Sequence, residues 1–504
     1  MARHLKDLRE FIEALAEIGE MQPIDRMVDW HLEMGAVIRH SYDTKAPAPL
    51  FNRIKDIEPG FRALGATFGT SANHGQFLAR CAVALGLAPG TPTQDLVSAL
   101  ADLFNSGKRI PPRTLATGPC KENRLIGDAI DLERFPVPYI HDGDGGRYFN
   151  TLGTVVAQTP DGQWTNWAIA RAMLVSKTQV VPSIGPSKDT TKIFAQWQAM
   201  GQDMPIAIFQ GGPPVIPFAS GGSLGEGVNE ADVLGGFLGE PIEVVKCETH
   251  GLTVPATSEI VVEGFLSLTE TEMEGPMGEY SGNLCPTAHG LKPVMNISAI
   301  TYRDRPILPV VTAGFPVEEN STVWGLGISG RIFGQLQRAK FPVGACFLLF
   351  EAACHLLVVT VPLDYIRQQK AQGRYSTDDL IARLRAVVFD QEPGRWIPRI
   401  VLLADDIDPA DINVVLWAIA TRCRPDQQLL YPDETCGQPL ISFLNDEERH
   451  TGRVTKTIWN CLRPDDLESA EVPIPSRFET AWPLETRERV LKNWKSYGYG
   501  ARGT

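Results

Sequence analysis

Two short stretches of the chain hold residue types that can grip an anion or move a proton. In the first, Asn166-Trp167-Ala168-Ile169-Ala170-Arg171, an Asn and an Arg bracket an apolar run. Arginine keeps its charge inside proteins, so a buried Arg171 needs an anion beside it. That anion is either a bound ligand or one of the chain's own carboxylates, and these residues alone favour the internal ion pair.

The second stretch, residues 270–282, crowds carboxylates into a Gly/Pro-rich loop. It contains Glu270, Glu272, Glu274 and Glu279. Such crowding raises the pKa of some carboxyl groups, which suits a general acid. A solvated acidic loop is an equally good interpretation on charge alone. Pro276 lies between two glycines and predicts a shaped turn, which favours a site.

Two glycine motifs offer other chemistry. Residues 221–225 match G-x-S-x-G, so a serine hydrolase acting through Ser223 is an alternative. The nucleophile elbow needs a helix directly after the serine, whereas the next helix is expected only near Asn229. A glycine-rich loop around a ligand is therefore favoured. Residues 325–330 match G-x-G-x-x-G, but a loop precedes them, so a packed helix start is favoured over a dinucleotide site.

Histidines and cysteines form no familiar metal motif in the sequence. H-E-x-x-H is absent, and the nine cysteines include no C-x-x-C pair, which disfavours a zinc hydrolase. The odd number of cysteines and the N-terminus without a signal-peptide core indicate reduced thiols in a cytoplasmic protein.

Charge and hydropathy exclude two classes of partner. The 504 residues carry 47 basic and 60 acidic side chains, a net charge of −13. Nucleic acid and anionic membranes require a basic footprint, so neither is an expected partner. No apolar run approaches the roughly 20 residues of a membrane span. An anionic small molecule remains compatible, because one well-placed arginine suffices.

The elements that must position these residues fall into an α+β or α/β multidomain pattern. Residues 1–112 indicate a mixed α/β unit that starts with an amphipathic helix over residues 5–18. Residues 113–318 show the pattern of a β-barrel or β-sandwich. Strands are expected near 151–158, 215–218, 243–247, 259–266, 294–302 and 307–311, and helices at 192–200 and 230–238. Residues 319–472 return to strand–helix alternation. A tail, 473–504, ends in a short helix over 484–497 whose Trp494 needs a surface to pack on.

At the two stretches above, the sequence resembles the UbiD family of reversible decarboxylases, which use prenylated FMN. The resemblance covers most of the chain and looks closest to the ferulic acid and pyrrole-2-carboxylate decarboxylase branch. It rests on segments in a fixed order: 118–123, 144–148, 164–167, 255–260, 274–279, 405–408 and 421–425. It implies an N-terminal α/β unit, a central split β-barrel that holds the flavin, and a C-terminal α/β unit that dimerises, with the terminal helix packing on the partner subunit.

The same resemblance implies a cofactor site. Asn166 and Glu230 correspond to ligands of a divalent metal, usually Mn²⁺, that clamps the flavin phosphate, and K⁺ is a further candidate. Oxygen ligands suit a hard cation. The family's metal-binding His falls at Asp189, which also offers oxygen. The expected flavin contacts are Asn166, Trp167, Ala168, Ile169, Ala170, Arg171, Lys188, Asp189, Ser220, Gly221, Gly222, Glu230 and Arg395. A flavin-contacting Lys of close relatives falls near Glu392, and Arg395 is expected to replace its charge.

The resemblance also implies catalysis by residues of the 166–171 stretch and of the acidic loop over 270–282. Arg171, Glu274 and Glu279 correspond to the family's catalytic Arg–Glu–Glu network, in which Arg171 binds the substrate carboxylate and Glu279 donates the proton. The implied reaction is non-oxidative decarboxylation of an aromatic, heteroaromatic or α,β-unsaturated acid through a covalent prenylated-FMN adduct. It also implies a homodimer and a flavin prenyltransferase that supplies the cofactor. Besides the hydrolase, an inactive flavin-binding protein is the remaining alternative.

Overall fold

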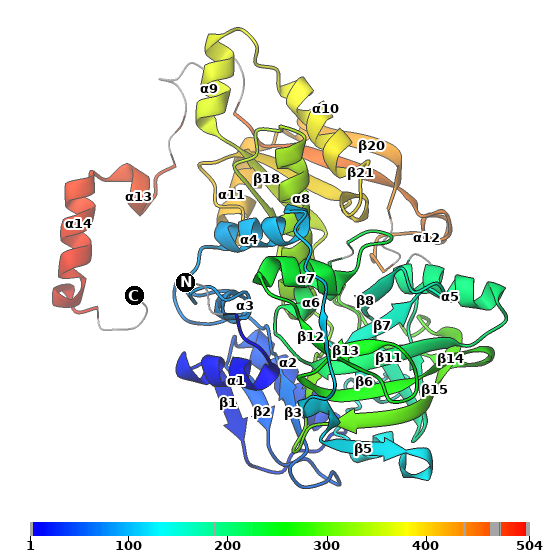
Figure 1. Cartoon of the computed structure of the whole chain (residues 1–504). Helices are drawn as coiled ribbons and strands as arrows, with labels where there is room; N and C mark the ends of the chain where they lie inside the picture. The colour runs from blue at the N-terminus through cyan, green and yellow to red at the C-terminus, as the bar shows by residue number, and fades with distance from the viewer. Residues whose placement is uncertain are drawn as a thin grey trace.

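The computed structural model describes residues 4–185, 188–222, 224–436, 440–463, 473 and 475–499. Three sheet regions follow one another in space in the order of the sequence (Figure 1). A small N-terminal sheet lies beside a curled central sheet, and a third sheet lies above them. The helices α4 (Thr93–Asn105), α6 (Ile216–Ser220), α7 (Glu230–Leu238) and α8 (Leu326–Arg338) fill the space between these regions.

The N-terminal unit packs three helices on a four-stranded sheet. The strand order is β1 (Met21–Ile24), β2 (Ala48–Phe51), β3 (Arg62–Gly65) and β16 (Ile307–Val310). The helices are α1 (Leu8–Glu17), α2 (Glu33–Asp43) and α3 (Ala79–Ala84). α1 buries Leu8, Phe11 and Leu15 on one face, as its apolar spacing predicts. The predicted strand at 307–311 is present, but it pairs in parallel with β3 and so completes this sheet instead of the central one.

The central region is a nine-stranded sheet that curls into a half-barrel. Its order is β6-β9-β10-β15-β14-β11-β7-β8, with β5 attached to β15. The long antiparallel pair β14 and β15 forms its spine. The strands are β5 (Asn123–Ile126), β6 (Tyr148–Asn150), β7 (Thr154–Gln158), β8 (Thr165–Ile169), β9 (Ala172–Ser176), β10 (Gln179–Pro182), β11 (Met204–Gly211), β14 (Ser258–Glu274) and β15 (Gly290–Tyr302). This confirms the predicted barrel class of the central region.

The third region alternates strands and helices, as predicted. Its sheet has the order β17-β18-β19-β21-β20. The strands are β17 (Ala345–Leu348), β18 (Leu356–Val361), β19 (Arg399–Ala404), β20 (Gln428–Thr435) and β21 (Arg453–Asn460), and the helices are α9 (Leu363–Ala371), α10 (Thr377–Val388), α11 (Ile412–Arg422) and α12 (Asp446–Thr451). A separate three-stranded sheet joins β4 (Arg113–Leu115), β12 (Glu243–Lys246) and β13 (Thr253–Pro255).

The structure tests the predictions for residues 215–218 and for the glycine motif at 325–330. The strand predicted over 215–218 is wrong: these residues enter α6, because the Gly211-Gly212 pair at positive φ turns the chain away from β11 before them. The 325–330 motif starts α8 directly after a π-helical turn, Asn320–Gly325, and not after a strand. A Cβ at Gly330 would lie 2.7 Å from that of Leu100, so the glycine lets α8 approach α4.

The helix predicted over 192–200 begins three residues earlier. The helix α5 runs over Asp189–Ala199, which places Asp189 in its first turn. α7 has the predicted bounds, and it ends at Gly239, whose positive φ is typical of a helix C-terminus.

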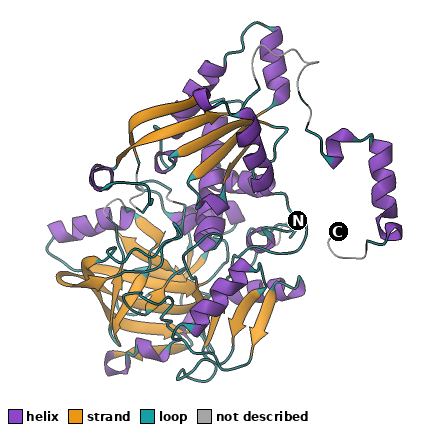
Figure 2. Cartoon of the chain, turned by 180° about the vertical axis from the view of Figure 1, so that it is seen from behind, coloured by secondary structure: helices purple, strands orange, loops and turns teal. Residues whose placement is uncertain are grey.

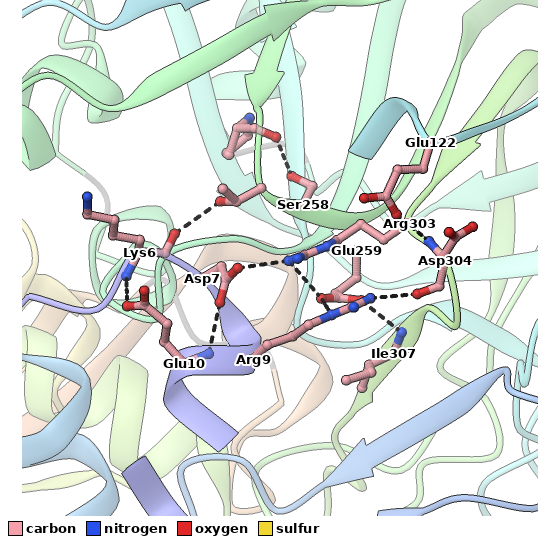
Figure 3. Close-up of polar contacts among 12 residues, drawn as sticks. Lys6, Asp7, Arg9, Glu10, Glu122, Ser258, Glu259, Arg303, Asp304 and Ile307 are labelled. Carbon is pink, nitrogen blue, oxygen red and sulfur yellow. Dashed lines mark hydrogen bonds and ion pairs between the residues drawn. The ribbon is translucent and has the colours of Figure 1, made fainter. Parts of the chain in front are cut away.

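A buried carboxylate ties α1 to the central sheet. Glu259 on β14 is fully buried and accepts hydrogen bonds from Arg9 at 2.9 and 3.0 Å, from Arg303 at 3.3 Å and from the amide of Ile307 at 3.2 Å. Figure 3 shows the two guanidinium groups converging on it. Asp7, the N-cap of α1, also accepts a hydrogen bond from Arg303 at 2.8 Å. The N-terminal helix is thereby fixed to the spine strand.

The C-terminal tail lies apart from the sheets in both views (Figures 1 and 2). It contains α13 (Phe478–Ala481), α14 (Leu484–Asn493) and a 3₁₀ turn, Trp494–Tyr497. Leu484 and Leu491 are 60% and 63% exposed, so its apolar side chains face solvent in the single chain. Of the helices in the described ranges, none combines the length and apolarity that crossing a bilayer requires.

The Glu259 network gives a stability prediction. Glu259→Gln should destabilise the protein by about 3 kcal/mol, because removing one partner of a buried ion pair leaves the other charges uncompensated. The matched control is Glu243→Gln, which breaks an ion pair to Arg113 that is exposed on both sides. Exposed pairs contribute at most about 1 kcal/mol. Thermal unfolding should show a drop of several degrees for the first variant alone, and equal midpoints would refute the anchoring role.

Candidate functional site

The connection between β8 and β9 places Arg171 against two carboxylates. Its Nε lies 2.8 Å from Oε1 of Glu274, its Nη2 3.3 Å from Oε2 of the same residue, and its Nη1 2.5 Å from Oε1 of Glu279. Glu274 and Glu279 are 2% and 7% exposed. The first sequence stretch therefore meets the second, as the resemblance implied, and the internal ion pair that the residues alone favoured is also present.

Electrostatics fix the charge of this cluster. Burial by itself would lower the pKa of Arg171, but the charges of Glu279 and Glu274 and their hydrogen bonds outweigh it, and the pKa is raised. Tyr148 donates a hydrogen bond of 3.2 Å to Glu274, and burial together with that carboxylate raises the pKa of Tyr148. The guanidinium thus stays charged, while the phenol stays protonated at neutral pH.

The segment 144–148 holds the loop that carries Glu279. Asp144 accepts the amide of Gly278 at 3.1 Å, and the amide of Gly145 donates to the carbonyl of Pro276 at 2.6 Å. Gly145 has no room for a side chain, since a Cβ there would lie 2.0 Å from the carbonyl oxygen of Gly275. These contacts explain why an Asp-Gly pair far upstream is needed to shape the acidic loop.

A second cluster of oxygen ligands lies where β8, α5 and α7 meet. Asn166 Nδ2 lies 3.3 Å from Oε1 of Glu230, and Asn166 Oδ1 accepts the hydroxyl of Thr190 at 3.1 Å. Glu230 Oε2 accepts the amide of Trp167 at 2.7 Å. Asp189 is close enough for its charge to act on Glu230. The three predicted metal ligands therefore converge from three elements.

Burial opposes the ionisation of Glu230 in this cluster. Glu230 is 2% exposed, and its burial raises the pKa to about 8, with the nearby charge of Asp189 acting in the same direction. Asp189 pairs with Lys192 at 2.9 Å, which offsets part of its charge. A bound divalent cation would stabilise the ionised form of Glu230, and an all-oxygen set suits Mg²⁺ or Mn²⁺.

The predicted glycine contacts line the end of α6. Ser220 closes that helix, its hydroxyl accepts from Thr154 at 3.2 Å, and Gly221 and Gly222 follow. Adding a Cβ to Gly222 would bring it 2.7 Å from the ring of Phe104. Ser223 itself lies outside the described residues. The segment follows a helix instead of the strand that a nucleophile elbow requires, which argues against the hydrolase alternative.

Lys188 directly precedes Asp189 of the oxygen cluster, which acts on it by its charge, whereas Arg395 makes its contacts elsewhere. The Nζ of Lys188 is 5.5 Å from the ring centroid of Trp396. The exposed Arg395 turns its guanidinium to the carbonyl of Asp390 at 3.0 and 3.2 Å. Glu392 is exposed, and its carbonyl accepts from Gln335 at 2.5 Å. The contacts of Arg395 in this structure do not join it to the other predicted flavin ligands.

Sequence reasoning missed Arg331. This residue on α8 donates to the carbonyl of Gly222 at 2.9 Å. Its burial lowers the pKa to about 10, opposed by the charges of Glu392 and Asp189. It therefore brings positive charge to the side of the site where Arg395 was expected to act. A signal was present, because Arg331 directly follows the 325–330 glycine motif and so comes one turn into a tightly packed helix.

An aromatic wall joins the acidic loop to the third region. The ring of Tyr280 lies 5.8 Å from Trp324 and 5.9 Å from His355, and Trp324 lies 6.2 Å from Trp396. Burial lowers the pKa of His355 to about 4, helped by the charge of Arg399, so this ring is neutral at pH 7.

Comparisons with known proteins match the whole architecture. Models of the 3-octaprenyl-4-hydroxybenzoate carboxy-lyase domains match residues 12–100 (N-terminal), 113–316 (Rift-related) and 321–461 (C-terminal). The pyrrole-2-carboxylic acid decarboxylase of Pseudomonas aeruginosa is 38% identical over 99% of this chain and 100% of its own. The chain belongs to the UbiD family.

Other UbiD relatives extend the likeness. Ferulic acid decarboxylase 1 of Saccharomyces cerevisiae is 33% identical, with 98% of each chain covered. Among solved structures, the vanillic acid decarboxylase of Sedimentibacter hydroxybenzoicus superposes with a TM-score of 0.81 at 24% identity, covering 98% of this chain and all of that one. A UbiD-class enzyme of Pelotomaculum thermopropionicum, solved with FMN, gives 0.78 at 23%, covering 95% and 99%. These structures show the same fold, and the family makes this protein a carboxy-lyase.

The oxygen cluster gives a pH prediction. Below about pH 8 the cation-free protein holds a proton on Glu230, so a divalent cation must displace it. The affinity of flavin-free protein for Mn²⁺ should therefore rise by up to about tenfold per pH unit between pH 6 and 8. Glu230→Gln should weaken binding and remove this slope.

Titration calorimetry at several pH values provides the measurement. Glu226→Gln is the matched control, because Glu226 is exposed and pairs with Lys192 beside the cluster. Its affinity and slope should match those of the wild type. An affinity that does not change with pH, or a slope that persists in Glu230→Gln, would contradict the assignment of the cation to Glu230.

Proposed function

We propose that this protein is a prenylated-FMN-dependent decarboxylase of an aromatic, heteroaromatic or α,β-unsaturated carboxylic acid, and that it works reversibly and without net oxidation. The observation behind this proposal is the buried cluster of Arg171, Glu274 and Glu279 in a UbiD chain. The substrates in the names of its full-length relatives, pyrrole-2-carboxylic and ferulic acids, belong to the proposed class.

The residues present fit a phosphorylated flavin with a divalent cation. Asn166, Asp189 and Glu230 supply oxygen ligands, and the buried carboxyl group of Glu230 forms no ion pair with any residue that the structure describes. Mn²⁺ is the proposed ion, with K⁺ as a further candidate. Gly221 and Gly222 present backbone without side chains, and Arg331 adds a positive charge beside them. Residues 166–171 are proposed to line the ring system. A solved UbiD-class enzyme of the same fold holds prenylated FMN.

In the proposed reaction, Arg171 receives the substrate carboxylate. Its fork of N–H donors matches two carboxylate oxygens, and Glu274 holds two of its nitrogens in place. The bond from the substrate carbon to the carboxylate then breaks, carbon dioxide leaves, and the electron pair stays behind. Bound prenylated FMN supplies the electron sink for that step.

Glu279 takes up a proton from solvent once the substrate carboxylate replaces it as an anionic partner of Arg171, and it then delivers that proton to the vacated carbon. Its carboxyl oxygen lies 2.5 Å from Nη1 of Arg171, so the acid lies next to the point where carbon dioxide departs. Protonation of the vacated carbon restores a neutral product and leaves Glu279 ionised beside the guanidinium, which stabilises that charge. Tyr148 and Asp144 keep Glu274 and the loop in position. Tyr280 and Trp324 are proposed to contact the substrate ring.

Substitution at Glu279 tests the proton donor. Glu279→Gln should cut carbon dioxide release by on the order of 10²–10⁴-fold, because glutamine keeps the size but cannot deliver a proton. Flavin binding should be unchanged. Glu272→Gln is the control, since Glu272 lies in the same acidic stretch but on the exposed part of β14. Rates are measured on enzyme loaded with prenylated FMN and Mn²⁺, with cofactor content checked by absorbance.

The same assay separates the alternatives. A catalytically inactive binder would show flavin absorbance without carbon dioxide release, and a hydrolase would need no flavin. Equal losses in Glu279→Gln and Glu272→Gln would show that the total charge of the loop matters and that Glu279 is not the donor. Full activity in protein free of flavin would overturn the proposed cofactor requirement, and with it the need for a flavin prenyltransferase.

We also propose that the protein acts as a homodimer, with the tail packing on the partner subunit. The tail, which lies apart from the sheets in Figure 1, exposes the apolar side chains of Leu484, Leu491, Trp494 and Tyr497. Trp417 on α11 is 41% exposed and offers an apolar surface of the same kind. Patches of this sort mark subunit contacts.

Light scattering tests the assembly. Wild-type protein at micromolar concentration should have at least twice the monomer mass of 55.3 kDa. Leu491→Lys should shift the population toward the monomer, because it places a charge in the proposed contact, whereas Glu272→Gln should not. A wild-type particle of monomer mass would contradict the proposal.

A further inference from the structure

A second cluster of metal-ligating side chains lies away from the proposed active site. Cys247 and His250 belong to the turn between β12 and β13, and Glu263 lies on β14, on the part of that strand far from Glu274. One ligand atom from each of the three residues lies within 4.8 Å of the other two. The sequence offered no known motif here, because a C-x-x-H turn gains its third ligand only through folding.

The ring of His250 is oriented as a metal ligand would be. Its Nε2 lies 3.1 Å from the carbonyl oxygen of Ile206, to which it donates. The other nitrogen, Nδ1, is buried and has no hydrogen-bond partner among the residues that the structure describes. A proton on that atom would have no acceptor, so Nδ1 carries a lone pair; burial also lowers the pKa of His250. Metal-bound histidines typically donate their second N–H to a carbonyl in this way.

The carboxylate of Glu263 is held in place by the same turn. It is fully buried and accepts the amides of Glu248 at 2.7 and 2.9 Å and of Thr249 at 3.0 Å, together with the hydroxyl of Thr249 at 3.2 Å. Oε1 accepts only one of these donors and retains a lone pair. Among the ion pairs formed by described residues, none includes Glu263. The nearby Lys121 pairs with Glu248 instead.

We propose that Cys247, His250 and Glu263 bind a zinc-class divalent cation. Sulfur, imidazole nitrogen and one carboxylate oxygen are the ligand types that Zn²⁺ takes, and a water molecule would complete four-coordination. On binding, a bond forms between the metal and the sulfur, and the thiol proton leaves to water. The two negative charges of thiolate and carboxylate then balance the cation.

This site differs in chemistry from the Asn166, Asp189 and Glu230 cluster. That cluster offers oxygen alone and suits a hard cation, whereas the thiolate here selects a softer one. A cation bound by Cys247, His250 and Glu263 would have a structural effect, because it would tie the β12–β13 turn to the spine of the central sheet. The inference does not depend on the proposed decarboxylation.

Cobalt substitution tests the site with a spectroscopic readout. Co²⁺ added to the reduced, metal-free full-length protein should give a thiolate-to-cobalt charge-transfer band in the near ultraviolet at one equivalent. Cys247→Ser should abolish that band. His250→Gln, which keeps the thiol, should weaken Co²⁺ binding by at least about tenfold, the loss that follows even outer-shell changes.

Two controls exclude other sources of the band. Cys423→Ser removes a half-buried thiol elsewhere, and Glu230→Gln disables the oxygen cluster; both should keep the band. Circular dichroism checks that each variant is folded, and if Cys247→Ser does not fold, His250→Gln decides. No band in folded wild type, or an unchanged band and affinity in His250→Gln, would overturn the proposal.

Discussion

The ion pairs between Arg171 and the two carboxylates of Glu274 and Glu279 are the constraint on which the site depends. A guanidinium that cannot lose its proton must be matched by anions when it is mostly buried, and these two acids supply them. They reach it from the end of a long strand and from the loop that follows. Arg171 therefore meets both acids only when the length of β14, the shape of that loop and the β8–β9 connection place the three side chains together.

Other contacts of the central region hold these three side chains in place. Asp144 and Tyr148 come from a segment well upstream and hold the acidic loop and Glu274 by direct hydrogen bonds. The spine strand is anchored at its other end by Glu259, which fixes α1 through Arg9. The same fold brings β8 to the starts of α5 and α7, so Asn166, which lies only a few residues before Arg171, meets the other two residues of the oxygen cluster.

The sequence predicts those helices whose positions depend on local residue patterns. The apolar spacing of residues 5–18 predicts α1, and α7 begins at Glu230 as expected. Contacts between distant segments could be expected only through the resemblance to the UbiD family, because neither Arg171 nor Glu274 identifies its partner by type or spacing. The Val215–Phe218 strand was wrong because β-branched and aromatic residues also suit a buried helix turn, and the glycines before them set the direction of the chain.

Residues that act through packing were the hardest to foresee. Arg331 and the Cys247–Glu263 contact depend on how α8 packs and on how β14 runs beside the β12–β13 turn, and neither feature leaves a periodic signal. The ion pair between Lys192 and Asp189 has a similar origin. α5 begins three residues before its predicted start, so Lys192 comes one helical turn after Asp189 and can pair with it.

Isotope exchange into the product tests the central claim, that Glu279 moves the proton at the carbon next to Arg171. The loaded enzyme is incubated in D₂O with the decarboxylated product of an acid that it consumes, and deuterium is followed by NMR at the carbon that carried the carboxylate. The account predicts steady incorporation with wild-type enzyme and none above background with Glu279→Gln, at equal cofactor content. Incorporation at the wild-type rate in Glu279→Gln would contradict it.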